Sequence, residues 1–160
     1  MQPGQILVAD HNHTHVIKMV GDVRLTLCVS FDKFIDSIFH GNGSCGIVFD
    51  LTEASAIDST TLGLMAKIAI LSRERCDLVP VVFSTNPSVD RLLETMGFDD
   101  IFEIVHEQHQ CAAPCRHLKA ADLDEQRAKE RILEAHHILM ELNESNRETF
   151  RDLVNTLEGR

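Results

Sequence analysis

The run Ile47-Val48-Phe49-Asp50-Leu51, followed a few residues later by Ile57-Asp58-Ser59-Thr60-Thr61-Leu62-Gly63, is the stretch that decides the fold. Its first part is short and almost continuously apolar, which is typical of a central strand that helices bury on both faces. Its second part places three hydroxyl residues before a long apolar stretch, which predicts a turn leading into a helix. Together the two parts indicate a strand, a turn and a helix of an α/β protein.

The segments on either side continue this alternation of strands and helices. Residues 5–22 predict two strands joined as a hairpin, and residues 31–39 predict a helix with Ser30 as its cap. Residues 79–84 predict a strand, residues 88–97 a short helix whose Gly97 suits a left-handed terminus, and residues 101–105 a last strand. We therefore expect an α/β fold in which helices cover a sheet that the opening hairpin makes mixed.

The chain divides into three regions by its composition. We expect a first domain over residues 1–107, a linker without apolar periodicity over 108–118, and a helical extension over 119–160. One long helix and a helical hairpin both fit the extension, and residues 145–148 resemble a capping box that starts a second helix. Its apolar stripe favours packing on the first domain, with homodimer formation as second choice; nothing in the sequence supports a role in covering the Ser59 surface.

The composition narrows the classes of function. Twenty-five acidic and 15 basic residues give a net charge of −10, so the surface should repel nucleic-acid phosphates and anionic lipid heads. No apolar stretch approaches the roughly 20 residues of a membrane span, and the first residues do not resemble a signal peptide. Five scattered cysteines fit a reducing compartment. We expect a cytoplasmic protein that binds other proteins, but neither nucleic acid nor a membrane.

The deciding stretch resembles the signature of the STAS domain family, in which an apolar strand ends in Asp-Leu and a turn with Asp-Ser-(Ser/Thr)-Gly-Leu-Gly leads into a helix. The resemblance covers residues 5–107 and includes Met96-Gly97-Phe98 near the last strand. It implies an anti-anti-sigma factor that is phosphorylated on the serine after the motif aspartate, here Ser59. The implied partners are an anti-sigma factor with serine kinase activity and a serine phosphatase. Thr61 replaces the family's usual glycine and is expected to alter either which partner fits or how well a kinase reaches Ser59.

The position of Ser59 supports a switch on physical grounds as well. Unpaired N–H groups and the helix dipole favour a negative group at a helix start, and a phosphate adds about −1.5 to −2 charges to the surface there. We expect a partner to bind unmodified Ser59 and to leave after phosphorylation, with Thr60 as second choice for the phosphate. The plainer interpretation is that Asp58 or Ser59 only caps the helix. The expected partner contacts are Asp58, Ser59, Thr60, Thr61 and Leu62.

Other classes of function fit the sequence less well. A receiver-like domain phosphorylated on Asp50 would need an acidic pair after an early strand and a lysine after the last, and the sequence has His106-Glu107 where the lysine should be. A STAS subunit of a larger sensory complex also remains open. The sequence lacks a glycine-rich phosphate loop, a Gly-x-Ser-x-Gly elbow and a His-Glu-x-x-His pair. We therefore expect no enzymatic activity and no cofactor.

Histidines and cysteines gather between residues 106 and 117, and zinc accepts both as ligands. Their spacing fits no common zinc site, because such sites add a second ligand pair further along the chain. We expect a solvated linker and no metal, and we interpret His136 and His137 in the extension as ordinary helix residues. If a metal does bind, its candidate ligands are His106, His109, Cys111, Cys115 and His117.

Overall fold

Six strands form one mixed sheet in the part of the chain that the computed structural model describes, residues 4–11, 13–40, 46–108, 115–119 and 124–159. The strand order is β5-β4-β3-β2-β1-β6. Strands β2 (Thr14–Val23), β3 (Gly46–Ile57), β4 (Val81–Phe83) and β5 (Glu103–Val105) are parallel. Strand β1 (Gln5–His11) is antiparallel to β2 and to β6 (Arg116–His117). The expected mixed sheet with its opening hairpin is confirmed.

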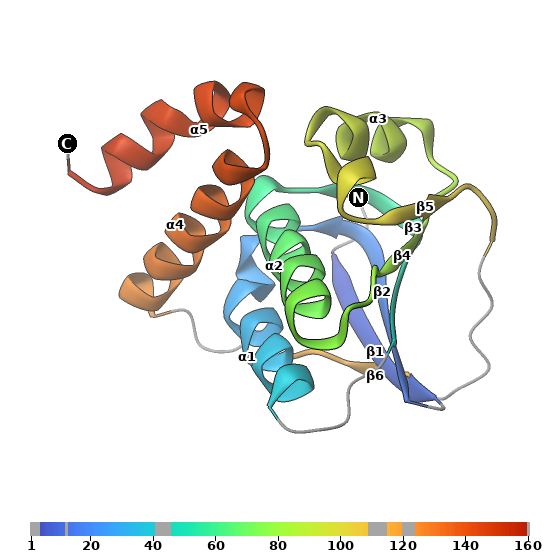
Figure 1. Ribbon diagram of the computed structural model, residues 1–160. Coiled ribbons are helices and arrows are strands. Elements are labelled where there is room, and N and C mark those ends of the chain that lie inside the picture. The colour runs from blue at the N-terminus through green and yellow to red at the C-terminus, as the bar shows by residue number, and fades with distance from the viewer. Residues whose placement is uncertain (1–3, 12, 41–45, 109–114, 120–123, 160) are drawn as a thin grey trace.

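Helices α1 (Cys28–Phe39) and α2 (Ser59–Cys76) cover one face of this sheet (Figure 1). The main core lies between these helices and the sheet, where Phe31, Ile35, Phe49, Leu64 and Ile68 are almost fully buried. The N-terminal half of α2 is buried nearly all round. A helix that is apolar on every side must be covered on every side, so a second layer lies over α2.

Several boundaries differ from those that the sequence predicts, including the shorter strands β4 and β5, and two of the differences have a clear local reason. Strand β3 continues to Ile57 rather than ending near Leu51. It does so because its pairing with β2 resumes after two irregularities, so that Val23 still pairs with Ile57. The predicted cap of α1 at Ser30 is wrong: the 3-10 turn η1 (Leu25–Leu27) runs directly into the helix at Cys28, so Ser30 lies inside it.

Helix α3 (Pro87–Thr95) and the 3-10 turn η2 (Phe98–Asp100) connect β4 to β5. Gly97 lies between them with a φ of +83°, the left-handed conformation that the sequence predicts. A Cβ atom at this position would lie 2.6 Å from Nδ2 of Asn143 in the C-terminal region. Glycine is therefore needed for the backbone conformation, and the lack of a Cβ also leaves room for the Asn143 side chain.

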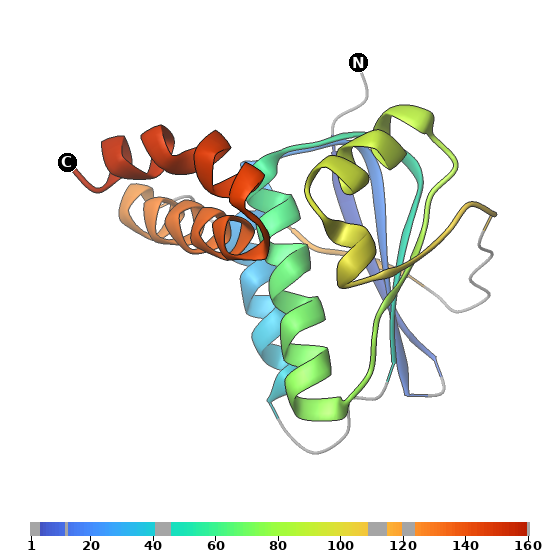
Figure 2. The same ribbon diagram turned by 45° about the horizontal axis from the view of Figure 1, so that its top comes forward.

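The C-terminal region forms two helices, α4 (Glu125–Leu142) and α5 (Glu144–Leu157). Helix α4 lies against the side of α1 and α2 that faces away from the sheet, and α5 packs against α4 (Figures 1 and 2). Asn143 ends α4 with extended backbone and caps α5 by accepting a hydrogen bond from the Asn146 N–H at 2.8 Å. The predicted capping box at 145–148 is therefore wrong, and the extension is a helical pair.

The proposed division at residues 107 and 118 stays a prediction. Within the predicted linker, β6 adds a short edge strand that pairs Arg116 with Val8 and His117 with Leu7. None of the described helices combines the length and the apolar composition that a membrane crossing requires.

Candidate functional site

Asp58 starts helix α2. Its backbone is extended, and its carboxylate accepts a hydrogen bond from the Thr61 N–H at 2.9 Å. Its own N–H donates to the Val23 carbonyl at 3.1 Å, which ties the helix start to the end of β2. Asp58 thus satisfies one of the orphan N–H groups of the first turn. The plainer interpretation, that this motif supplies the helix cap, is correct for Asp58.

Ser59, the first residue of α2, has a different contact. Its Oγ lies 2.7 Å from Nε2 of His136, a residue of α4 that is 77 positions away in the sequence. The other ring nitrogen of His136, Nδ1, lies 2.7 Å from the Ile132 carbonyl, which can only accept a hydrogen bond. Nδ1 therefore carries the proton of the neutral ring, Nε2 accepts, and the Ser59 hydroxyl donates.

The environment of His136 keeps its ring neutral. His136 is 1% exposed, and the Phe150 ring of α5 stands edge-on to it with 5.0 Å between the ring centroids. Burial lowers the pKa of His136 below 6.5, against the opposing effects of the Ile132 hydrogen bond and the Asp58 charge. The neutral imidazole is thus the form that fits this site at physiological pH.

The other expected partner contacts are covered in this structure. Thr60, Thr61 and Leu62 are each at most 3% exposed, whereas Asp58 and Ser59 are half-buried. The buried Thr60 hydroxyl is thus a poor phosphate acceptor in this structure. Thr61, the departure from the family pattern, offers no surface to a partner in this arrangement.

Gly63 allows α4 to approach α2 closely. A Cβ atom on Gly63 would lie 2.3 Å from the Ala135 carbonyl oxygen and 2.5 Å from the Ala135 Cβ. Contacts this short require the backbone of α4 to move. The glycine of the signature and a small residue on α4 therefore set the distance between the two helices.

Ion pairs flank this close approach. Lys67 of α2 contacts Asp32 of α1 at 2.8 Å and Glu134 of α4 at 3.1 Å, and Arg131 of α4 contacts Asp32 at 2.9 Å. Burial lowers the pKa of Lys67, but the hydrogen bonds and charges of Asp32 and Glu134 outweigh burial and raise it. The network links α1, α2 and α4 through alternating charges.

A further joint lies where α5 meets the loop after α3. Asn146 is 1% exposed, and its Nδ2 donates to the Met96 carbonyl and to the Leu139 carbonyl, both at 2.9 Å. One side chain thus joins α5, α4 and the segment before Gly97. Helices α4 and α5 are held to the first domain at both this joint and the Ser59 surface.

Sequence reasoning placed Ser59 at a helix start but did not predict its contact with His136. The local pattern of α4 gives no sign that this histidine faces a serine so distant along the chain. One indirect signal exists in Gly63, because a glycine inside an apolar helix destabilises it by about 1 kcal/mol relative to alanine and often marks a close helix contact. That signal indicates a neighbouring element without identifying it.

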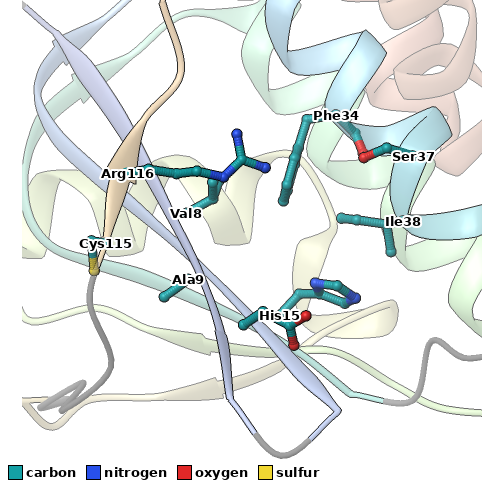
Figure 3. A pocket seen from close by; sticks show the side chains of 9 residues that line it. Val8, Ala9, His15, Phe34, Ser37, Ile38, Cys115 and Arg116 are labelled. Atoms are coloured by element: carbon teal, nitrogen blue, oxygen red, sulfur yellow. The ribbon is translucent and has the colours of Figure 1, made fainter.

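A hollow of about 380 Å³ lies beside the C-terminal half of α1, and it shares no residue with the Ser59 site (Figure 3). The Arg116 guanidinium lies 5.7 Å from the centroid of the Phe34 ring, and the His15 ring meets Phe34 edge-on at 6.4 Å. The Arg116 contact is a cation–π pair. The contact between Arg116 and Phe34 thus helps to hold the edge strand β6 to α1.

The candidate metal ligands are only partly within the described residues. His109 and Cys111 lie outside them. His106 is near Asp90 at 3.4 Å, Cys115 lines the hollow, and His117 belongs to β6. Among the residues that the structure describes, no three His, Cys, Asp or Glu side chains are grouped so as to hold a metal ion.

Comparisons with known proteins give a family and a fold. The model of the STAS domain family matches residues 5–111. An anti-sigma factor antagonist from Mycobacterium paratuberculosis is 19% identical with a TM-score of 0.54, covering 66% of this chain and 87% of that chain. A Thermotoga maritima structure assigned to the anti-sigma factor antagonists is 19% identical with a TM-score of 0.52, covering 62% and 85%. No curated relative matches the sequence. The STAS-like fold predicted from the sequence is confirmed.

Proposed function

The chain belongs to the STAS domain family, and from this premise we propose that it acts as an anti-sigma factor antagonist, a regulatory protein without enzymatic activity. Unmodified, it binds an anti-sigma factor that is also a serine kinase, and so releases a sigma factor. The kinase transfers the γ-phosphoryl group of ATP to Ser59 Oγ, with release of ADP and the hydroxyl proton. A serine phosphatase hydrolyses the ester with water and restores the hydroxyl.

The observation that carries this proposal is that Asp58 and Ser59, though adjacent, make different contacts. Asp58 caps α2 through the Thr61 N–H, so the Ser59 hydroxyl is not required for capping. It instead donates to a side chain outside the matched family segment, His136. A polar group that is held at a surface and paired there with another element is suited to recognise a partner.

The same geometry explains why phosphorylation would end binding. Ser59 is the first residue of α2, where the helix dipole favours a negative group such as a phosphate. In a complex the phosphate would place about −1.5 to −2 charges in a contact built around a neutral hydroxyl donor. The penalty thus falls on contacts made with the Ser59 hydroxyl and spares the fold of the first domain.

The first prediction concerns binding of this chain to the anti-sigma factor kinases of the source organism. Each kinase is produced together with its sigma factor, and the affinity of the chain for it is measured by calorimetry. The Ser59→Ala chain should bind one of them, and the Ser59→Asp chain should bind it at least about tenfold more weakly, since a buried unpaired charge opposes binding. Ser55, exposed near the end of β3, provides the control, and Ser55→Asp should bind like the unmodified chain.

Equal binding by Ser59→Ala and Ser59→Asp would contradict the switch. An equal loss of affinity in the Ser55→Asp chain would show a general effect of negative charge and would contradict a specific role of Ser59.

The receiver-like alternative has no support from the structure, because Asp50 is 2% exposed and accepts hydrogen bonds from the Thr52 N–H and hydroxyl at 3.0 and 2.6 Å. A role as a STAS subunit of a larger sensory complex stays a prediction.

A further inference from the structure

The surface around Ser59 is already occupied in this chain. Helix α4 covers the N-terminal half of α2, with His136 on Ser59, Ala135 on Gly63 and Glu134 on Lys67. An anti-sigma factor that recognises the Ser59 hydroxyl cannot reach it while His136 accepts its hydrogen bond. Binding of α4 and binding of a partner at this surface therefore exclude each other.

We propose that α4 is a built-in competitor of the anti-sigma factor: it occupies the Ser59 surface of the unbound chain, and the partner must displace it. This inference rests on the proposed function and adds its regulation. The chain then exists in a closed state with α4 docked and an open state with Ser59 available. The apparent affinity for the partner is the affinity of the open state multiplied by its population.

The contacts of α4 also describe the partner that fits. The surface offers a hydroxyl donor at Ser59, a flat contact at Gly63 and a cation at Lys67, with Asp32 beside it. Helix α4 meets these with an acceptor, a small residue and an acid, and with Arg131 one turn earlier for Asp32. The partner segment should be a helix that carries a base, then an acid three residues later, followed by a small residue and a hydrogen-bond acceptor.

The α4 interface has the character of a reversible contact. Its fully buried residues are small or polar apart from Leu139: Ala128, Ala135, His136 and Leu139. The other large apolar residues of α4 that pack against the core, Ile138, Met140 and Leu142, are only partly buried. Alanine buries little apolar area, at about 25 cal/mol per Å², so ion pairs and single hydrogen bonds supply a substantial part of this contact. Interfaces of this polar kind are typical of elements that move relative to each other.

Docked α4 also restricts phosphorylation. The Ser59 Oγ is 2.7 Å from a ring nitrogen that is itself buried, which leaves no room for a phosphorus atom and its oxygens. Transfer of the γ-phosphoryl group of ATP to this hydroxyl therefore requires the open state. Phosphorylation of Ser59 and binding of the partner thus both require the undocking of α4.

The test uses substitutions on α4, which leave the Ser59 surface unchanged, in the full chain. His136→Ala removes the acceptor, and Ala135→Leu adds bulk against Gly63. His137→Ala is the matched control, because His137 is the neighbouring residue on α4, is half-exposed and pairs at 3.1 Å with Glu158, the residue that follows α5. Both test variants should populate the open state, and the control should remain closed.

The first measurement is hydrogen exchange of the unbound chain. In the His136→Ala and Ala135→Leu chains, amides at the start of α2 and along α4 should exchange at least about tenfold faster than in the parent, because weaker docking raises the open population. Amides in β2 and β3 should stay protected, which shows that the first domain remains folded. Unchanged exchange in both variants would overturn the proposal that α4 is displaceable.

The second measurement is binding to the anti-sigma factor kinase, and it separates this proposal from the proposed function. Tighter binding by both α4 variants, by about the factor seen in exchange, supports the built-in competitor. Faster exchange without tighter binding, while Ser59→Asp still weakens binding relative to Ser59→Ala, overturns the competitor and leaves the switch standing. Failure of every chain, including Ser59→Ala, to bind any anti-sigma factor kinase overturns both.

Discussion

At the scale of single residues, the contact between α4 and Ser59 depends on the protonation state of His136. The ring accepts from Ser59 only through an unprotonated Nε2, since Nδ1 donates to Ile132. Burial lowers the pKa of His136, Asp58 of α2 raises it and His137 of α4 lowers it, while α5 faces the ring with the neutral Phe150. Protonation would remove the acceptor and place a charge in a buried site.

The pH dependence of α4 docking follows from this shift. Because the pKa is lower in the docked state than the ordinary 6.5, the undocked state binds more protons as the pH falls. Docking is therefore strongest above about pH 6.5 and weakens as the pH falls toward the lowered pKa. Hydrogen exchange at the start of α2, corrected for intrinsic rates, should become faster as the pH is lowered from about 7.5 to about 5.5.

The controls for this pH dependence are the two neighbouring histidines. His136→Ala should exchange fast at both pH values, and His137→Ala should keep the acceleration of the parent chain. Equal protection of the parent chain at both pH values would contradict the role assigned to His136.

Residue-level reasoning from the sequence succeeded where the determining contacts are local. The hydroxyl residues before Leu62 predict a helix start because capping and helix dipoles act within one turn, and Asp58 and Ser59 lie there. His136 was interpreted as an ordinary helix residue because its partner is 77 positions away. No local periodicity contains that information.

At the scale of elements, the order of strands and helices was predictable, because hydrophobic periods of two and of three to four residues act locally. The length of strand β3, from Gly46 to Ile57, was not predictable, because it depends on irregular pairing with β2. The choice between one long helix and a helical pair was also open in the sequence. It depends on Asn143, whose extended backbone ends α4 and whose side chain starts α5.

The joint between the C-terminal helices and the rest of the chain centres on Asn146. Asn146→Ala leaves the Met96 and Leu139 carbonyls without their 2.9 Å donors in a buried site. The free energy of unfolding should fall by about 1–3 kcal/mol, as measured by urea denaturation. Asn155, half-buried on the same helix, is the control, and Asn155→Ala should change stability by less than about 0.5 kcal/mol. A loss of equal size at both positions would show that Asn146 holds no special joint.

At the scale of the whole molecule, the chain has three layers: the sheet, then α1 and α2, then α4 and α5 (Figure 2). The first two layers contain most of the segment that matches the family, and the sequence predicted the helices of the third layer without their position. The third layer lies on the Ser59 surface, an arrangement that no local pattern indicates. Regulation at Ser59 would thus combine a covalent change with a competition inside one chain.

The most direct test of the central claim, that Ser59 is the switch, is intact-mass measurement of the chain from cells in two growth states, with fragmentation to locate any phosphate. We predict a species heavier by one phosphate in one of the two states, with the phosphate on Ser59 and absent from a Ser59→Ala chain. A phosphate that is found elsewhere, or no phosphate on residues 58–63 in either state, would contradict the account.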